Sequence, residues 1–171
     1  MNFNDIDSTC PPEEKEAIEF TCRMGWMGGD VYGSFNPKSE ITYGEMCVIF
    51  YNMFDGAYDS TWEYRTGHWA SAYAAWVEKR LSRAGLPEQH NDERLDAIVT
   101  MCNLKELLKV FFGVLIKNYE SQPTGLREEG NTSRGVMASE IFKHCRLFIK
   151  QLCSYSSKEL IQFWTERQNT E

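Results

Sequence analysis

The sequence lacks the features that would place the protein in or across a membrane. Its longest apolar stretch, residues 110–116, is far shorter than the roughly 20 residues that span a bilayer. Its N-terminal residues, MNFNDIDSTCPPEEKEAIEF, contain no basic start followed by an apolar run, which a secretory signal would need. We therefore expect a cytoplasmic protein with no membrane partner.

Closely spaced cysteine pairs are also missing. None of the six cysteines stands in a C-x-x-C pattern. Four of them, Cys22, Cys47, Cys102 and Cys145, lie among apolar residues in segments that we expect to be helical. In a protein without an export signal, such cysteines are most simply buried, reduced thiols. Disulfides are the alternative if an export signal has been removed from this sequence.

The sequence contains no motif for catalysis or for a cofactor. The three histidines, His68, His90 and His144, have no second ligand at helical spacing, which argues against a metal site. His144 and Cys145 are neighbours, and neighbouring residues of a helix point about 100° apart, so they do not form a dyad. No G-x-S-x-G motif and no phosphate-binding loop ending in G-K-[ST] occurs. We predict a protein that is not an enzyme and binds neither metal nor cofactor.

The charge and the apolar content narrow the class of protein further. The formal net charge is −7, and an acidic surface repels the phosphates of nucleic acids and of anionic lipids. The sequence is 42% hydrophobic and 13% aromatic, enough to bury a core, so we exclude global disorder. These numbers favour a folded acidic domain that does not bind nucleic acid nonspecifically.

Helix signals dominate, and we predict an all-α protein folded as a single compact bundle. A first helix starts at the prolines Pro11 and Pro12 and ends before Gly25. Thr42 and Glu45 form a capping box that starts a second helix. Apolar residues at helical spacing predict further helices over residues 68–84, 92–101, 103–115 and 135–152, the third of them capped by Asn103, and a last helix capped by Ser156 or Ser157.

The order helix, glycine turn and capped helix occurs twice, and it resembles the S-layer homology family. Phe35-Asn36-Pro37 followed by Ile41-Thr42-Tyr43-Gly44-Glu45-Met46 is similar to the second half of that family's repeat. His68-Trp69-Ala70, Tyr73, Trp76 and Gly85-Leu86 are similar to the first half of the next repeat, and we expect Trp69, Tyr73 and Trp76 to fill the seam between the helices. A weaker third echo begins at Ser133. The interpretation divides the chain into repeats over residues 14–54 and 67–117, a flexible connector over 118–132 and C-terminal helices over 133–168.

The resemblance implies a helical scaffold that binds an anionic cell-wall polysaccharide, but the basic contacts of that family are mostly replaced. The arginine that follows the threonine of the motif is Tyr43 in the first repeat. In the second repeat, aligning Glu106 with the glutamate of the motif puts Leu104 in this place. The third echo keeps Arg134 but has Val136 instead of the glutamate. We therefore expect a scaffold of this kind in another role.

The segment from Asp55 to Trp69, DGAYDSTWEYRTGHW, is the candidate binding site. It contains five residues whose types are enriched at the centres and rims of interfaces: Tyr58, Trp62, Glu63, Tyr64 and Arg65. The alternative is that the loop folds back and buries its own aromatic rings. Trp26, Tyr32 and Phe35 in the preceding loop have the same two interpretations, with packing favoured for them.

The leading hypothesis is a non-catalytic cytoplasmic protein that binds a protein or a protein–nucleic-acid complex and acts by occlusion or bridging. Phage and mobile-element inhibitors of host defence, including anti-CRISPR proteins, are often small acidic chains, so an inhibitor is a narrower hypothesis that rests on analogy. Binding of cell-wall polysaccharide is the second hypothesis. An enzyme with no recognisable motif is the third.

Overall fold

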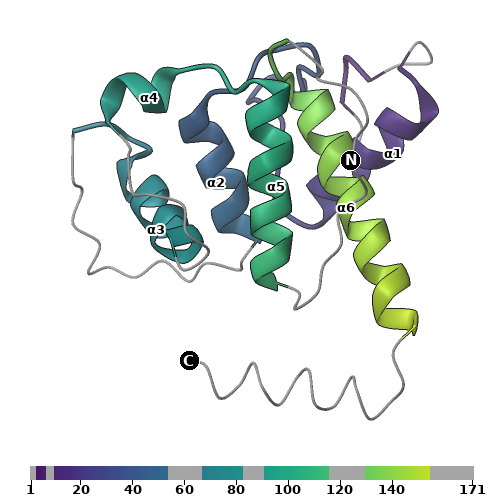
Figure 1. The fold of residues 1–171 in the computed structure, drawn as a ribbon. Helices are drawn as coiled ribbons and strands as arrows, with labels where there is room; N and C mark the ends of the chain where they lie inside the picture. Colours follow the sequence, from purple (N-terminus) through teal and green to yellow (C-terminus); the bar gives the residue numbers. More distant parts are fainter. Residues whose placement is uncertain (1–2, 7–9, 54–66, 83–90, 116–129, 155–171) are drawn as a thin grey trace.

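A computed structural model describes residues 3–6, 10–53, 67–82, 91–115 and 130–154, and these form an all-helical bundle. The described helices are α1 (Pro12–Arg23), α2 (Tyr43–Met53), α3 (Ser71–Ser82), α4 (Asp92–Asp96), α5 (Met101–Leu115) and α6 (Arg134–Ser154). Helix α1 packs on α6, and α3 and α4 pack on α2. Helices α2, α5 and α6 run side by side in the middle of the bundle (Figure 1). In the described residues no helix could cross a membrane.

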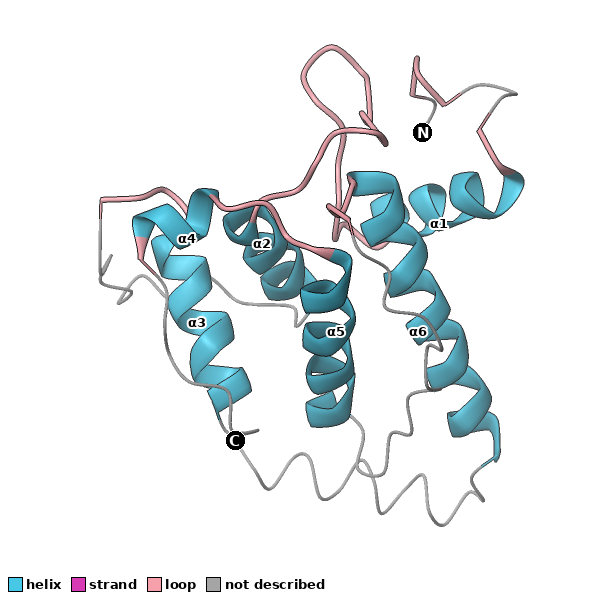
Figure 2. Cartoon of the chain, turned by 45° about the horizontal axis from the view of Figure 1, so that its top comes forward, coloured by secondary structure: helices cyan, strands magenta, loops and turns pink. Residues whose placement is uncertain are grey.

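Helices α2, α5 and α6 all begin at one junction of backbone hydrogen bonds. Three short extended segments, residues 40–42, 98–100 and 131–133, meet there through isolated bridges. Their central residues form a closed ring: the Ile41 N–H donates to the Thr132 carbonyl (3.0 Å), Thr132 to Val99 (2.7 Å), and Val99 to Ile41 (3.0 Å). Figure 2 shows the described loops gathered at this end of the bundle.

A second ring of hydrogen bonds repeats the pattern two residues further on. The donors are the first residues of the three helices, and each N–H–to–carbonyl distance is 2.9 Å: Tyr43 to Ala97, Met101 to Gly130, and Arg134 to Ser39. The two rings give the junction an approximate threefold arrangement, in which Tyr43, Met101 and Arg134 occupy equivalent positions. The donors belong to the first turn of a helix, whose N–H groups have no partner within the helix.

Each of the three helices is capped in the same way. The hydroxyl of the residue before the helix accepts a hydrogen bond from the backbone N–H three residues later: Thr42 from Glu45 (3.2 Å), Thr100 from Asn103 (3.3 Å) and Ser133 from Val136 (3.4 Å). At Thr42 the predicted capping box is confirmed, because the Glu45 carboxylate accepts from the Thr42 N–H (2.9 Å).

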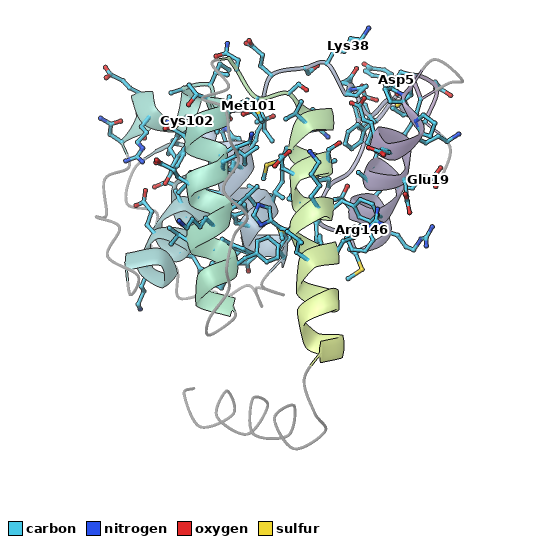
Figure 3. The ribbon with its side chains drawn as sticks, turned by 45° about the vertical axis from the view of Figure 1, so that its right-hand side comes forward. Asp5, Glu19, Lys38, Met101, Cys102 and Arg146 are labelled. Atoms are coloured by element: carbon cyan, nitrogen blue, oxygen red, sulfur yellow. The ribbon has the colours of Figure 1, made fainter. Side chains whose placement is uncertain are left out.

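Glycine stands second in two of the three capped helices because the neighbouring backbone approaches closely. A Cβ at Gly44 would lie 2.8 Å from the Ala70 Cβ, and one at Gly135 would lie 3.1 Å from the Pro37 carbonyl oxygen. The equivalent residue of α5 is Cys102, which is exposed (Figure 3). The prediction that Cys102 is buried was wrong, whereas Cys22, Cys47 and Cys145 are buried free thiols.

Aromatic contacts connect the helices within one core. The Phe50 and Phe111 rings lie 4.5 Å apart between α2 and α5, and Phe20 and Phe142 lie 5.1 Å apart between α1 and α6. Between α2 and α3, Tyr51 makes edge contacts with Tyr73 (5.2 Å) and with a tryptophan of α3, Trp76 (5.0 Å). These apolar faces account for the helical spacing in the sequence.

Several predicted boundaries differ from the structure. The third helix begins at Ser71 and not at residue 68, because His68 to Ala70 form the turn that precedes it. The helix expected over 92–101 ends at Asp96, because the junction holds residues 98–100 extended. The predicted connector, 118–132, overlaps the junction at residues 130–132. The predicted last helix lies outside the described residues.

The register of the second repeat was also wrong. Thr100, and not Asn103, caps α5. The residue equivalent to Tyr43 and Arg134 is therefore Met101, which is buried, and Leu104 lies one turn inside the helix, where it is fully buried. Met101 therefore takes the place that was assigned to Leu104, and it is not basic either.

Thr132 offers a test of the junction. The equivalent side chains, Ile41 and Val99, are apolar and buried, whereas the buried hydroxyl of Thr132 has no hydrogen-bond partner among the described residues. We expect Thr132→Val to raise the free energy of unfolding by about 1 kcal/mol, since an unpartnered buried hydroxyl costs roughly 1–3 kcal/mol. Urea denaturation measures this difference.

Val99→Thr is the matched control, because it introduces a hydroxyl at the equivalent place and should destabilise by a similar amount. Equal or lower stability of Thr132→Val would show that the Thr132 hydroxyl has a partner.

Candidate functional site

An open groove of about 360 Å³ lies beside the junction, where the loop after α1 faces one side of α2 and the first residue of α6. We call it the Arg134 groove. It is lined by residues 25–29, by Glu45, Val48, Ile49 and Asn52 of α2, by Trp69 before α3, and by Arg134 of α6. A second hollow continues from it along residues 28–30, 35–36 and 39–40 and shares Glu45 and Arg134. The junction positions the groove, because both α2 and α6 begin there.

Arg134 forms the polar wall of the groove. Its Nε donates to the Phe35 carbonyl (2.9 Å), and its Nη2 donates to the Gly28 carbonyl. The guanidinium carbon lies 4.9 Å from the centre of the Phe35 ring, a cation–π contact. Arg134 therefore holds the loop after α1 in place as well as facing the groove.

The residue equivalent to Arg134 in the first capped helix, Tyr43, has a different environment. Its ring is buried beneath the guanidinium of Arg94 (4.6 Å), and its hydroxyl donates to the Glu78 carboxylate (3.1 Å). Burial is the main cause that raises the pKa of the Tyr43 hydroxyl, followed by the nearby Cys47 and Glu78. Tyr43 packs between α2, α3 and α4 and does not face solvent as a binding residue would.

Trp69 is the exposed aromatic residue of the groove. Its side chain is 55% exposed, whereas Tyr73 and Trp76 on α3 pack against the core. The prediction that Trp69 fills the seam between helices was therefore wrong. The cause is its position: it stands in the turn before α3, outside the helical repeat that buries Tyr73 and Trp76.

His68 fixes the backbone beside Trp69. Its Nδ1 accepts a hydrogen bond from the Ala70 N–H (3.1 Å), so Nε2 carries the proton and donates to the Asp96 carboxylate (3.1 Å). The His68 ring also lies 5.5 Å from the Trp69 ring. With both nitrogens engaged, His68 is a structural residue at the start of α3, as its position in the sequence indicated.

The aromatic residues of the loop after α1 have three different environments. Phe35 is fully buried and Trp26 is half-buried, where it contacts Phe20 edge-on at 5.6 Å. Tyr32 is 82% exposed. The packing interpretation is thus right for Phe35 and wrong for Tyr32, because Tyr32 lies at the tip of the loop.

The predicted binding residues Tyr58, Trp62, Glu63, Tyr64 and Arg65 lie outside the described residues, so their exposure stays a prediction. Trp69, the last residue of the candidate segment, was not among the predicted binding residues, although it lines the groove. A signal that could have found it is its place next to His68, whose side chain accepts a hydrogen bond from Ala70 just before α3 begins.

The lining of the groove is suited to binding. Among the described residues, no group of three or more His, Cys, Asp or Glu side chains is placed to hold a metal ion. The lining combines indole rings, aliphatic side chains and bare glycine backbone with one guanidinium and one carboxylate. Such a mixture gives apolar contact area with a few polar groups that set orientation.

Comparisons with known proteins do not assign the chain to a family. No protein-family model and no curated protein sequence matches it. The resemblance to S-layer homology domains thus stays a prediction that rests on the residues quoted above.

Replacement of Arg134 tests whether its hydrogen bonds hold the loop. Arg134→Lys keeps the charge but loses the fork that reaches two carbonyls and covers the Phe35 ring. We expect it to lower the free energy of unfolding by about 1–2 kcal/mol, nearly as much as Arg134→Gln does, as measured by chemical denaturation. Full stability of Arg134→Lys would show that the charge alone is needed.

Proposed function

We propose that the protein is a non-catalytic binding protein that engages a macromolecular partner, either a protein or a protein–nucleic-acid complex, by occlusion or bridging. The observation that carries the proposal is Trp69, an exposed indole at the mouth of the Arg134 groove with its backbone fixed by His68. Tryptophan is among the residues most enriched at interface hot spots. A fixed backbone beside the indole also reduces the conformational entropy lost on binding.

The sequence around Trp69 extends this proposal. The predicted binding residues, Tyr58 to Arg65, directly precede the turn that positions Trp69. A partner that covers Trp69 would thus contact the chain within a few residues of that segment. The narrower hypothesis, a cytoplasmic inhibitor of host defence of the anti-CRISPR kind, rests on the small size and acidity of the chain alone.

Substitution of Trp69 tests the proposal. The tagged chain would be used to isolate its partner from cells of its source, and the affinity for the purified partner would then be measured. We expect Trp69→Ala to cost about 2 kcal/mol or more of binding free energy, with little change in melting temperature because the side chain is half in solvent. Trp62→Ala should behave in the same way if the predicted loop takes part.

Trp76→Ala is the matched control, because this tryptophan packs on Tyr51 between α2 and α3. It should lower stability by about 3–5 kcal/mol, as core truncations do, and reduce binding only through loss of folded protein. A partner bound equally well by Trp69→Ala would contradict the proposal for this groove.

A second candidate function is the binding of an anionic wall polysaccharide, which a groove lined by the Arg134 guanidinium and by the indoles of Trp26 and Trp69 favours. The net charge of −7 and the replacement of the other two basic positions by Tyr43 and Met101 oppose it. We expect isolated cell-wall sacculi not to retain the protein in a sedimentation assay.

If sacculi retained the unmodified protein but not a folded Arg134 variant, binding of wall polysaccharide would become the leading function. Since Arg134 also holds the loop after α1, the assay needs the folded fraction of Arg134→Lys measured in the same buffer.

A further inference from the structure

The loop between α1 and α2 presents two apolar side chains to solvent at its tip. Val31 is 93% exposed and Tyr32 is 82% exposed, more than any other large apolar side chain in the described residues. Single exposed apolar residues are common on protein surfaces, but two neighbours at a loop tip form a projecting apolar surface. They can act as a binding surface at low entropic cost only if the loop holds them in a defined conformation.

Asp30 organises the loop from within. One carboxylate oxygen accepts hydrogen bonds from the backbone N–H groups of Tyr32 (2.9 Å) and Ser34 (3.0 Å), and the other accepts from the Asn36 side chain (3.0 Å). These hydrogen bonds, that of the Ser34 N–H first, lower the pKa of the Asp30 carboxyl. The carboxylate stays charged at neutral pH, and its contacts persist there.

The N-terminal segment and the core hold the loop from outside. The Asp5 carboxylate accepts from the backbone N–H groups of Phe35 (2.8 Å) and Asn36 (2.6 Å). The Asn4 N–H donates to the Gly33 carbonyl (3.0 Å), and the Asn4 side chain donates to the Tyr32 carbonyl (3.1 Å). Phe35 anchors the base of the loop in the core. The tip is therefore ordered before any partner arrives, which reduces the entropy lost on binding.

The surroundings of the tip are mostly acidic. Four carboxylates, those of Asp5, Asp30, Glu40 and Glu45, belong to the loop, to the segment that holds it or to the hollow beneath it. The basic groups of this region are Arg134, which is bound to the loop carbonyls, and Lys38, which points away from the molecule (Figure 3). Charge complementarity thus favours a cationic partner surface.

We propose that Val31 and Tyr32 form a docking surface for a basic segment of a protein partner, in which apolar residues stand next to lysine or arginine. The apolar residues of that segment cover the tip, and its cations face the carboxylates around the base of the loop. This inference rests on the proposed function, because it takes the ligand to be a macromolecule. It places the recognition on the tip of the loop, and the Arg134 groove is a separate surface.

A displayed library of random peptides, selected on the full chain, provides the probe. We expect the enriched peptides to combine aromatic or aliphatic residues with lysine or arginine. For a synthetic copy of one such peptide, calorimetry should show affinity reduced about tenfold or more by the double substitution Val31→Ser and Tyr32→Ser. Raising the salt concentration should weaken binding several-fold, because the charged contacts are exposed and screened.

Matched variants separate this proposal from the proposed function. Met24→Ser with Ile98→Ser removes two exposed apolar side chains from other surfaces, and this control should bind as the unmodified chain does. The tip variant should keep its melting temperature, because both side chains lie in solvent. Trp69→Ala should also bind the peptide normally.

Four results would contradict this proposal. Enrichment of acidic or uncharged peptides would overturn the proposed partner. Loss of binding in Trp69→Ala alone would overturn the docking surface and leave the proposed function standing. Binding that the tip variant does not alter would overturn the docking surface, while the proposed function would still be decided by the affinity of Trp69→Ala for the isolated partner. A dimer in analytical ultracentrifugation that the tip variant abolishes would show that a second copy of the chain, and no basic segment, covers the tip.

Discussion

Six backbone hydrogen bonds between three short extended segments set the geometry on which the rest of the structure depends. The segments are too short to form a sheet, yet each one satisfies the next in a closed ring, so none has an unpaired edge at the junction. Because each segment continues into a helix within two residues, the ring also sets where α2, α5 and α6 begin. The core then follows from the apolar faces of helices that start together.

The junction also explains why the groove lies where it does. The junction has three corners, one at the first residue of each helix: Tyr43, Met101 and Arg134. These residues have equivalent backbone positions but different side chains, so the corners differ in chemistry. At two corners an arginine lies over an aromatic ring, with the partners exchanged: Arg94 over Tyr43, and Arg134 over Phe35. In the first pair the aromatic ring comes from the helix and is buried. In the second the helix supplies the cation, and the corner stays open to solvent.

Local signals in the sequence predicted much of this fold. The capping box of Thr42 and Glu45 needs only residues three apart, and Pro12 at the start of α1 reflects the fixed backbone angle of proline. The start of α5 could not be predicted in the same way. Thr100 and Asn103 are both good capping residues. Only the hydrogen bonds that Val99 makes with Ile41 and Thr132 hold the chain extended up to Thr100 and so decide between them. The exposure of Trp69 depends on the preceding turn, which apolar spacing does not encode.

The exposure of the loop aromatic residues could not be predicted from the sequence either. The sequence indicated that aromatic residues in loops could be either packed or exposed, and it had no means of separating Phe35 from Tyr32. The difference arises from contacts with Asp5 and Asn4, some thirty residues away, which fix the path of the loop. Such contacts depend on the folded chain as a whole, so residue types and spacing do not reveal them.

The glycines of the junction have a consequence for how this chain can change over time. At Gly44 and Gly135 a Cβ would lie 2.8 Å from the Ala70 Cβ and 3.1 Å from the Pro37 carbonyl oxygen, so a side chain would force its neighbours to move and selection for a stable fold favours glycine at both positions. At Cys102 the same site on the third corner faces solvent, and a side chain is accommodated there. If the three corners descend from one ancestral unit, the α5 corner has been freest to diverge. Its sequence would then lose the common pattern first, as Cys102 in the place of Gly44 and Gly135 illustrates.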